Sequence, residues 1–132
     1  MKKIFVLICI SLIAFTSCNQ SGSKNETPIK QEIKENVRYK MFPTENMWTF
    51  LKLDTRNGKI WQVQYSIDDK NFRGEVVLNS EALASGDSAE NGRFTLYQTK
   101  NMYNFILLDQ INGKMWQVQW SLDDENRVII PM

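Results

Sequence analysis

The side chains that could carry chemistry in this chain are amides, aromatic rings and carboxylates. The sequence of 132 residues contains no His, and its two cysteines are Cys9 and Cys18. Nucleophilic triads of the Ser-His-Asp and Cys-His types and the usual His/Cys zinc sites are therefore excluded. The sequence also lacks a glycine-rich phosphate-binding loop. We predict a non-catalytic protein that has no catalytic residues, no metal ligands and no cofactor.

Paired carboxylates occur twice, at residues 68–69 and 123–124. Calcium-binding loops place oxygen ligands at alternate positions and include a turn glycine, and the segments SIDDKN and SLDDEN do neither. We therefore expect two turns with solvated acidic side chains. Asp54 and Asp109 could form the carboxylate pair of a glycosidase, but both sit at the entry to Asn-Gly turns, where capping of backbone amides explains them.

The repeated amides of this chain belong to a stretch that occurs twice. GKIWQVQYSIDD, residues 58–69, returns as GKMWQVQWSLDD, residues 113–124. Two explanations for the glutamines in this stretch remain open. The amides hydrogen-bond across strands or between the two copies, or they form part of a neutral binding surface.

The repeated stretch is part of a longer internal duplication. Residues 38–71 align without a gap to residues 93–126, at an offset of 55, and eighteen of the 34 aligned positions are identical. The small and polar segment LASGDSAEN separates the copies. We predict a duplicated domain over 38–132, with repeat 1 at about 38–83 and repeat 2 at about 93–132.

Each copy has the pattern of antiparallel strands. Segments rich in Trp, Tyr, Val and Phe are separated by Asn-Gly and Asp-Asp turns, which favours strands over helices. The strands predicted for the first copy cover residues 38–44, 47–54, 59–66 and 73–79. Each copy is then a three- or four-stranded meander, too small to bury its apolar face alone. We predict an all-β fold of two tandem antiparallel meanders, packed as a pseudo-twofold sandwich or a small barrel.

The side chains of the repeated strand alternate between its two faces. In the first copy, Trp61, Val63 and Tyr65 share one face, and Gln62 and Gln64 share the other. The second copy repeats this division. Because large aromatic rings bury the most area, we expect the Trp face to form the core in both copies and the glutamines to face outward.

A further candidate contact lies at the start of the second strand of each copy. Asn46-Met47-Trp48 and Asn101-Met102-Tyr103 place apolar residues on both faces of this strand. Core packing explains these residues, and so does a contact patch, because aromatic residues and Met are enriched in interface cores. The candidate binding residues from the sequence are Gln62, Gln64, Gln117, Gln119, Trp48 and Tyr103.

The first residues have the layout of a secretory signal peptide. Lys2 and Lys3 precede an apolar run over residues 4–15, and small residues follow. The run is too short to span a hydrocarbon core of roughly 30 Å, which takes about 20 residues. We therefore expect residues 1–17 to be a signal peptide that is removed from the mature protein.

The end of this signal, FTSC, resembles the lipobox of type II bacterial lipoprotein signals, although Leu is usual at the position of Phe15. The resemblance implies that Cys18 is acylated and attaches the protein to a membrane of the cell envelope; plain secretion with a free thiol is the alternative. Asn19 is not the Asp that this family associates with inner-membrane retention, which implies the outer membrane, at its periplasmic or surface face. Residues 18–37 would then be the lipidated N-terminus and a flexible tether.

The charge balance limits the possible partners. Removal of residues 1–17 takes away Lys2 and Lys3, so 14 of the 16 Lys and Arg residues remain against 15 Asp and Glu. This near-neutral chain has no basic stripe of the kind that binds nucleic acid. We therefore expect no nucleic-acid partner.

These features favour a binding module at the cell envelope. Size, signal and the lack of catalytic groups resemble those of envelope lipoproteins that act as immunity proteins, which bind and block a toxin in the periplasm. This resemblance implies a protein partner. A carbohydrate-binding lipoprotein is the alternative, because exposed Trp and Tyr can stack on sugar rings while Gln, Asn and Asp bond to hydroxyls. A structural subunit of an envelope complex is a third reading.

Overall fold

The structure is a computed structural model, and it describes residues 36–132. The predicted signal peptide over residues 1–17, the acylation candidate Cys18 and the tether as far as residue 35 lie outside the described residues. Among residues 36–132, no helix has the length and apolar character needed to cross a membrane. Besides two 3-10 turns at Gly86–Ser88 and Asp124–Asn126, the elements are β1 Tyr39–Pro43, β2 Thr49–Asp54, β3 Ile60–Gln64, β4 Gly74–Asn79, β5 Phe94–Gln98, β6 Asn104–Asp109, β7 Met115–Gln119 and β8 Val128–Pro131.

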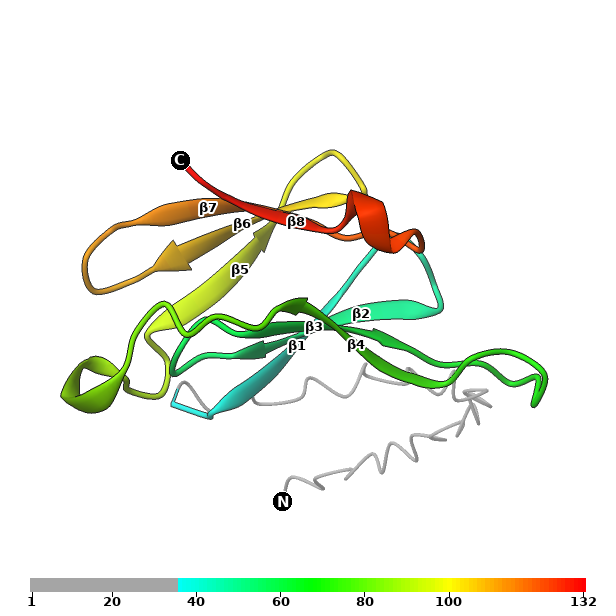
Figure 1. The fold of residues 1–132 in the computed structure, drawn as a ribbon, viewed down its shortest axis with the longest axis horizontal. Helices are drawn as coiled ribbons and strands as arrows, with labels where there is room; N and C mark the ends of the chain where they lie inside the picture. The colour runs from blue at the N-terminus through cyan, green and yellow to red at the C-terminus, as the bar shows by residue number, and fades with distance from the viewer. Residues whose placement is uncertain (1–35) are drawn as a thin grey trace, which may run out of the picture. The chain divides into compact units, whose positions relative to one another are not determined.

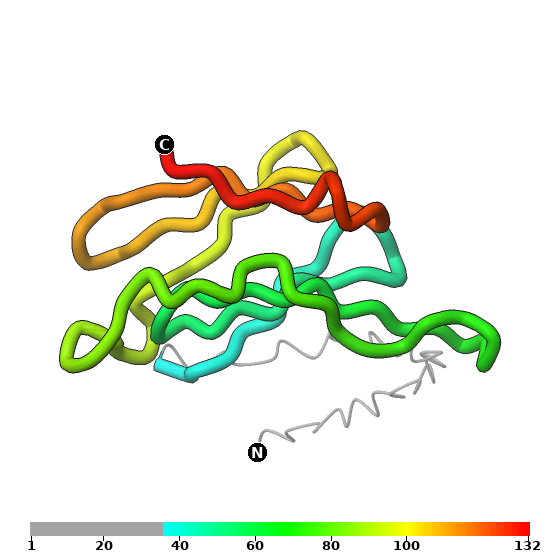
Figure 2. Tube along the Cα trace, viewed as in Figure 1, coloured from blue at the N-terminus to red at the C-terminus, as the bar shows by residue number. Residues whose placement is uncertain are grey.

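The strands form two antiparallel sheets of four strands each, one sheet per copy of the repeat. The first has the order β1-β2-β3-β4 and the second the order β5-β6-β7-β8, so each sheet is a simple meander. Figure 1 shows the sheets as two layers, and the trace in Figure 2 follows the chain from one layer into the other. Buried residues of both sheets form one hydrophobic core. The predicted all-β sandwich of two meanders is therefore confirmed, and the sheets of the described part do not close into a barrel.

The predicted Asn-Gly turns join the second and third strands of both copies. In the first copy, the N–H of Gly58 donates to the carbonyl of Asp54 over 2.9 Å, and the Asp54 carboxylate accepts from the N–H of Arg56. Gly58 has a φ of +79°, a left-handed conformation that glycine adopts without steric cost. Gly113 and Asp109 repeat the turn with a φ of +75° and the same 2.9 Å bond.

An arginine–aspartate pair ties the start of each copy to the same turn. Arg38 donates to the Asp54 carboxylate at 3.2 Å, and Arg93 donates to the Asp109 carboxylate at 2.7 Å. Burial by itself would raise the pKa of Asp109, but hydrogen bonds from Arg93 and from two backbone N–H groups of the turn outweigh it, and this pKa is lowered. Both aspartates thus hold turns in place, as their position in the sequence predicts.

Each sheet has two different faces, which we call the aromatic face and the glutamine face. The aromatic face carries the Trp of the repeated strand, and the glutamine face carries its two Gln. The pairing of the strands assigns to the aromatic face Tyr39, Met41, Phe50, Lys52, Trp61, Val63 and Tyr65 in the first copy, and Phe94, Leu96, Phe105, Leu107, Trp116, Val118 and Trp120 in the second. It assigns to the glutamine face Lys40, Phe42, Thr49, Leu51, Leu53, Ile60, Gln62 and Gln64, and in the second copy Thr95, Tyr97, Asn104, Ile106, Leu108, Met115, Gln117 and Gln119.

In the first copy, the glutamine face is the buried one. Leu51, Leu53 and Gln62 are fully buried, whereas Trp61 is only half-buried and Tyr65 is exposed. The prediction that the Trp face of this copy forms the core is therefore wrong, and so is the prediction that Gln62 faces outward.

In the second copy, the aromatic face is the buried one, as predicted. Phe105, Leu107, Val118 and Trp120 are buried, while Met115 on the glutamine face is exposed. The contact between the sheets therefore joins the glutamine face of the first copy to the aromatic face of the second. Because these faces are not equivalent, the packed side chains do not follow a twofold axis.

The charged residues of the first aromatic face favour burial of the second one. Lys52 stands in the middle of the first aromatic face, opposite Trp61, where it pairs with Glu75 and lies with its Nζ 4.6 Å from the Trp61 ring centroid. The equivalent residue of the second copy is Leu107, which is fully buried. Removing an ammonium group from water costs several kcal/mol unless it is paired, so the face without the lysine is the one that forms the apolar core of the domain.

Candidate binding site

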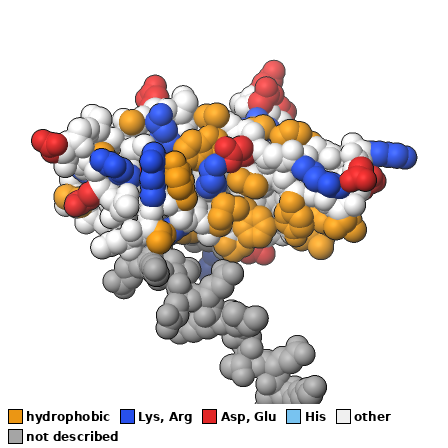
Figure 3. Space-filling model, turned by 90° about the horizontal axis from the view of Figure 1, so that it is seen from below, with side chains coloured by type: hydrophobic (Ala, Val, Ile, Leu, Met, Phe, Trp, Pro, Cys, Tyr) orange, Lys and Arg blue, Asp and Glu red, His pale blue; other side chains and the backbone are white. Residues whose placement is uncertain are grey.

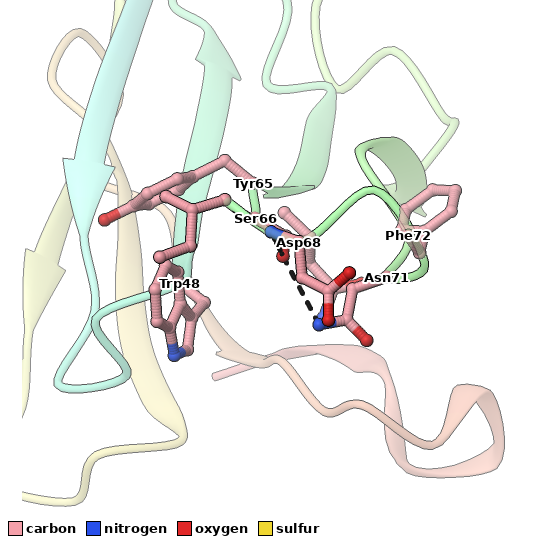
Figure 4. A pocket seen from close by; sticks show the side chains of 8 residues that line it. Trp48, Tyr65, Ser66, Asp68, Asn71 and Phe72 are labelled. Carbon is pink, nitrogen blue, oxygen red and sulfur yellow. Dashed lines mark hydrogen bonds between the residues drawn. The ribbon is translucent and has the colours of Figure 1, made fainter.

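Each copy of the repeat has an open hollow between the loop before its second strand and the turn after its third. The first hollow has a volume of about 410 Å³ and the second about 300 Å³. The first is lined by Trp48, Gln64, Tyr65, Ser66, Ile67, Asp68, Asn71 and Phe72, and six of these side chains are labelled in Figure 4. The second is lined by Asn101, Tyr103, Asn104, Gln119, Trp120, Ser121 and Asn126.

The wall that carries Trp48 or Tyr103 is shaped by local side-chain hydrogen bonds. In the first copy, the Thr44 hydroxyl donates to the carbonyl of Thr49 at 2.9 Å, and the Asn46 side-chain oxygen accepts from the N–H of Trp48 at 2.9 Å. The second copy makes the same bonds at the equivalent positions. Thr and Asn readily form such turns because their short polar side chains reach neighbouring backbone groups. The turn thus fixes where each aromatic side chain leaves the backbone.

The opposite wall of the first hollow is the acidic turn. The Ser66 hydroxyl accepts from the N–H of Asp68 at 3.0 Å and from the side-chain amide of Asn71 at 3.3 Å, the bond drawn in Figure 4. The Asp68 carboxylate accepts from the N–H of Lys70 at 2.9 Å. The acidic pair of this copy therefore lies in a turn, as predicted, and one of its carboxylates orders that turn.

An aromatic pair stands in both hollows but is accessible in only one of them. The ring centroids of Trp48 and Tyr65 are 5.3 Å apart, and those of Tyr103 and Trp120 are also 5.3 Å apart. Trp48 and Tyr65 are 37% and 44% exposed, whereas Trp120 is 1% exposed and donates its indole N–H to the carbonyl of Met102. The first hollow thus presents both rings of this pair, beside the exposed ring of Phe72, and the second presents one ring of its pair, because the copies bury opposite faces.

The structure divides the predicted binding residues among different places. Trp48 and Gln64 line the first hollow, and Tyr103 and Gln119 line the second. The sequence therefore named one aromatic ring and one amide of each hollow. It did not indicate that the two hollows differ in exposure.

The other two predicted residues, Gln62 and Gln117, lie on the glutamine faces. Gln117 donates its side-chain amide to the side-chain oxygen of Asn104 on the neighbouring strand at 2.8 Å. Gln62 is 0% exposed, and among the described residues neither of its side-chain polar atoms has a hydrogen-bond partner. The same holds for the hydroxyl of Thr49, which stands where the second copy has Asn104. The cross-strand explanation therefore applies to Gln117, whereas Gln62 is an unsatisfied amide in the core.

Sequence reasoning missed several residues of the first hollow. Ser66 and Asn71 recur as Ser121 and Asn126, and this identity was a usable signal because both positions flank the acidic turn. Phe72 had no such signal, since the second copy has a charged residue at the equivalent position.

The aromatic face of the first sheet lies on the outside of the domain, and we call it the outer aromatic face. Tyr39 and Trp61 form an edge-to-face pair with centroids 6.4 Å apart, and Tyr39, Met41 and Val77 are each about half exposed. Figure 3 shows the domain from below, where hydrophobic side chains gather across the middle with Lys and Arg side chains among them. This surface was not predicted, although Lys52 in the middle of an aromatic face was the signal for it.

Neither a metal site nor similarity to known proteins identifies a function. In the part of the chain that the structure describes, no three His, Cys, Asp or Glu side chains gather where they could hold a metal ion. Comparisons with protein-family models, with curated proteins and with solved structures find no match. The two hollows and the outer aromatic face are therefore the candidate binding surfaces of the described domain.

The contrast between the buried Gln62 and the half-buried, hydrogen-bonded Gln117 predicts opposite effects of the same substitution. Gln62→Met should raise the free energy of unfolding by about 1 kcal/mol or more, because it removes a buried polar group that lacks a partner. Gln117→Met should lower this free energy by about 1 kcal/mol, because it breaks the bond to Asn104. Urea denaturation of both variants measures the difference. Equal destabilisation by the two substitutions would contradict the assignment of Gln62 as unsatisfied.

Proposed function

We propose that this chain is a non-catalytic binding module of the cell envelope, held at a membrane by acylated Cys18, and that its partner is a protein. The observation that carries the proposal is the outer aromatic face, where Tyr39, Met41 and Val77 are each about half exposed. Contiguous apolar patches on a protein surface mark interaction sites once they exceed a few hundred Å².

The composition of the outer aromatic face suits a protein partner. Trp, Tyr and Met are enriched in the cores of protein–protein interfaces, and Trp and Tyr are enriched among the residues that contribute most binding energy. The central charge of the face, Lys52, is paired with Glu75, so the surface is close to neutral. A nucleic acid would require a basic stripe instead. An immunity-type inhibitor of a periplasmic toxin combines such a surface with the expected location.

The immunity role predicts that a toxin gene lies beside this gene, and that Met41→Glu abolishes protection against this toxin. An unpaired carboxylate in an apolar interface should weaken binding at least about tenfold. The measurement is the growth of cells that direct this toxin to the periplasm, with the wild-type chain or a variant. Ile111→Glu, at a residue that is 56% exposed in a turn of the second copy, is the control and should protect fully. Survival without the wild-type chain would contradict the immunity role, and full protection by Met41→Glu would exclude this face.

The lipid anchor predicts that Cys18→Ala releases the protein from membranes. Acyl chains contribute about 0.8 kcal/mol per buried methylene, so their loss should move the protein to the soluble fraction. Ultracentrifugation of disrupted cells followed by immunoblotting measures this distribution. A Cys18→Ala variant that stays in the membrane fraction would show that something other than acylation holds it there.

The first hollow supports carbohydrate binding as a second candidate function. Trp48 and Tyr65 offer two accessible rings for a sugar, and Gln64, Asp68 and Asn71 border them with hydrogen-bonding groups. A sugar ring packs on an aromatic face through its C–H groups while its hydroxyls bond to amides and carboxylates. The second hollow lacks the second accessible ring and therefore serves as an internal control.

This second function predicts that soluble oligosaccharides quench the Trp fluorescence of the protein. Trp48→Ala should abolish the quenching, whereas Tyr103→Ala in the second hollow should leave it intact. Fluorescence titration with a panel of envelope oligosaccharides makes the comparison. Quenching that survives Trp48→Ala, or no quenching of the wild-type chain, would rule out the first hollow as a sugar site.

A further inference from the structure

Each sheet has one outward face. The face of the other sheet that carries the equivalent residues, 55 positions away in the sequence, is packed inside the domain. The outer aromatic face is equivalent to the aromatic face of the second sheet, which packs against a glutamine face. The glutamine face of the second sheet is equivalent to the glutamine face of the first, which provides that packing surface. Apart from the paired charges Lys52 and Glu75, which stand where the second copy has Leu107 and Ile129, the two outward faces therefore resemble the two halves of a contact that the domain already makes once.

Both outward faces are open to a partner. On the glutamine face of the second sheet, which we call the outer glutamine face, Tyr97, Met115 and Ile130 are 54%, 43% and 50% exposed. Ile106 and Leu108 lie between them and are only half-buried. Their equivalents in the first copy, Leu51 and Leu53, are fully buried by the second sheet. The outer glutamine face thus has the same kind of aliphatic centre and nothing of this domain on top of it.

We propose that the outer aromatic face of one chain packs on the outer glutamine face of a second copy of this chain, in the arrangement that joins the two sheets within a chain. This inference rests on the proposed function, since it uses the same protein-binding face, on which a second copy of the chain would compete with a toxin. The similarity of the two copies indicates this partner. Inside the chain an aromatic face packs on a glutamine face, so a glutamine face of a second copy is the surface expected to fit the outer aromatic face.

The charges of the two faces are compatible with this contact. The strand residues that make up the outer glutamine face are uncharged. Lys52 keeps its partner Glu75 on its own sheet, and the amide oxygens of Gln117 and Gln119 offer further acceptors. A buried ammonium group requires such partners. The contact therefore leaves no charge unpaired.

The size of the faces predicts a weak and reversible contact. Four strands spaced by about 4.8 Å, with five residues of about 3.3 Å each, give a footprint of roughly 300 Å². Stable complexes bury about 800 Å² on each partner, so the association should depend strongly on concentration. A shared membrane anchor would strengthen the association, because it raises the effective concentration of the domains.

The contact is head-to-tail, because it joins two different faces. Such contacts continue until a ring closes or a filament grows. Two chains supply four sheets of four strands, and radial rings of about four to eight such sheets are a known architecture. We therefore expect a closed ring of few copies or an extended stack, and no face-to-face dimer.

Paired substitutions test the contact. The exported full chain carrying Cys18→Ser, which lacks the acylation site, should associate with increasing concentration, as measured by light scattering after size-exclusion chromatography. Met41→Glu on the outer aromatic face and Met115→Glu on the outer glutamine face should each weaken association about a hundredfold. Their mixture should form a one-to-one dimer and nothing larger, because one intact junction remains. Ile111→Glu should associate like the parent chain, and urea denaturation verifies that each variant is folded.

Other outcomes overturn the inference. A parent chain that stays monomeric at every concentration would overturn it and leave the face to another protein or to residues 19–35. Association that survives Met115→Glu but not Met41→Glu, with no dimer in the mixture, would indicate a face-to-face dimer. In either case, loss of toxin protection by Met41→Glu would leave the proposed function standing. Conversely, self-association with unchanged toxin protection by Met41→Glu would remove the toxin as a partner of this face.

Discussion

The packing of a glutamine face on an aromatic face is the contact on which the rest of this domain depends. Neither four-stranded meander has a core of its own, since a single small sheet leaves both of its faces in water. The core forms where Leu51, Leu53 and Ile60 of the first sheet meet Phe105 and Val118 among the residues of the second. Each sheet thereby covers one face, and the opposite face of each remains open.

This one-sided contact explains why two similar copies came to differ. Leu107 is fully buried, whereas its equivalent Lys52 is half-buried on the outer aromatic face and paired with Glu75. Trp120 is buried and bonded through its indole, while its equivalent Tyr65 borders an open hollow. The duplication thus produces the same strands and turns twice, and the packing of the sheets buries equivalent residues to different extents.

The same asymmetry gives the two copies different candidate binding surfaces. A symmetric sandwich would bury equivalent residues and present equivalent surfaces, so its two hollows would be alike. In this domain, one hollow offers the accessible rings of Trp48, Tyr65 and Phe72, and the other offers that of Tyr103. The outer aromatic face exists because the contact uses the other face of that sheet. Binding to these surfaces needs no titrating nucleophile or metal, which agrees with a sequence that has no His.

The sequence alone determined the secondary structure and the duplication. Alternation of apolar and polar residues indicated the strands, and the Asn-Gly turns, confirmed at Gly58 and Gly113 with positive φ, indicated where they reverse. It could not determine which face of each sheet is buried, because both faces carry apolar residues and a period of two is the same for either choice. Only the packing of one sheet on the other made that choice, and it buried Gln62 while leaving Trp61 at the surface. Lys52 was a signal in the sequence for this outcome, because an ammonium group resists removal from water.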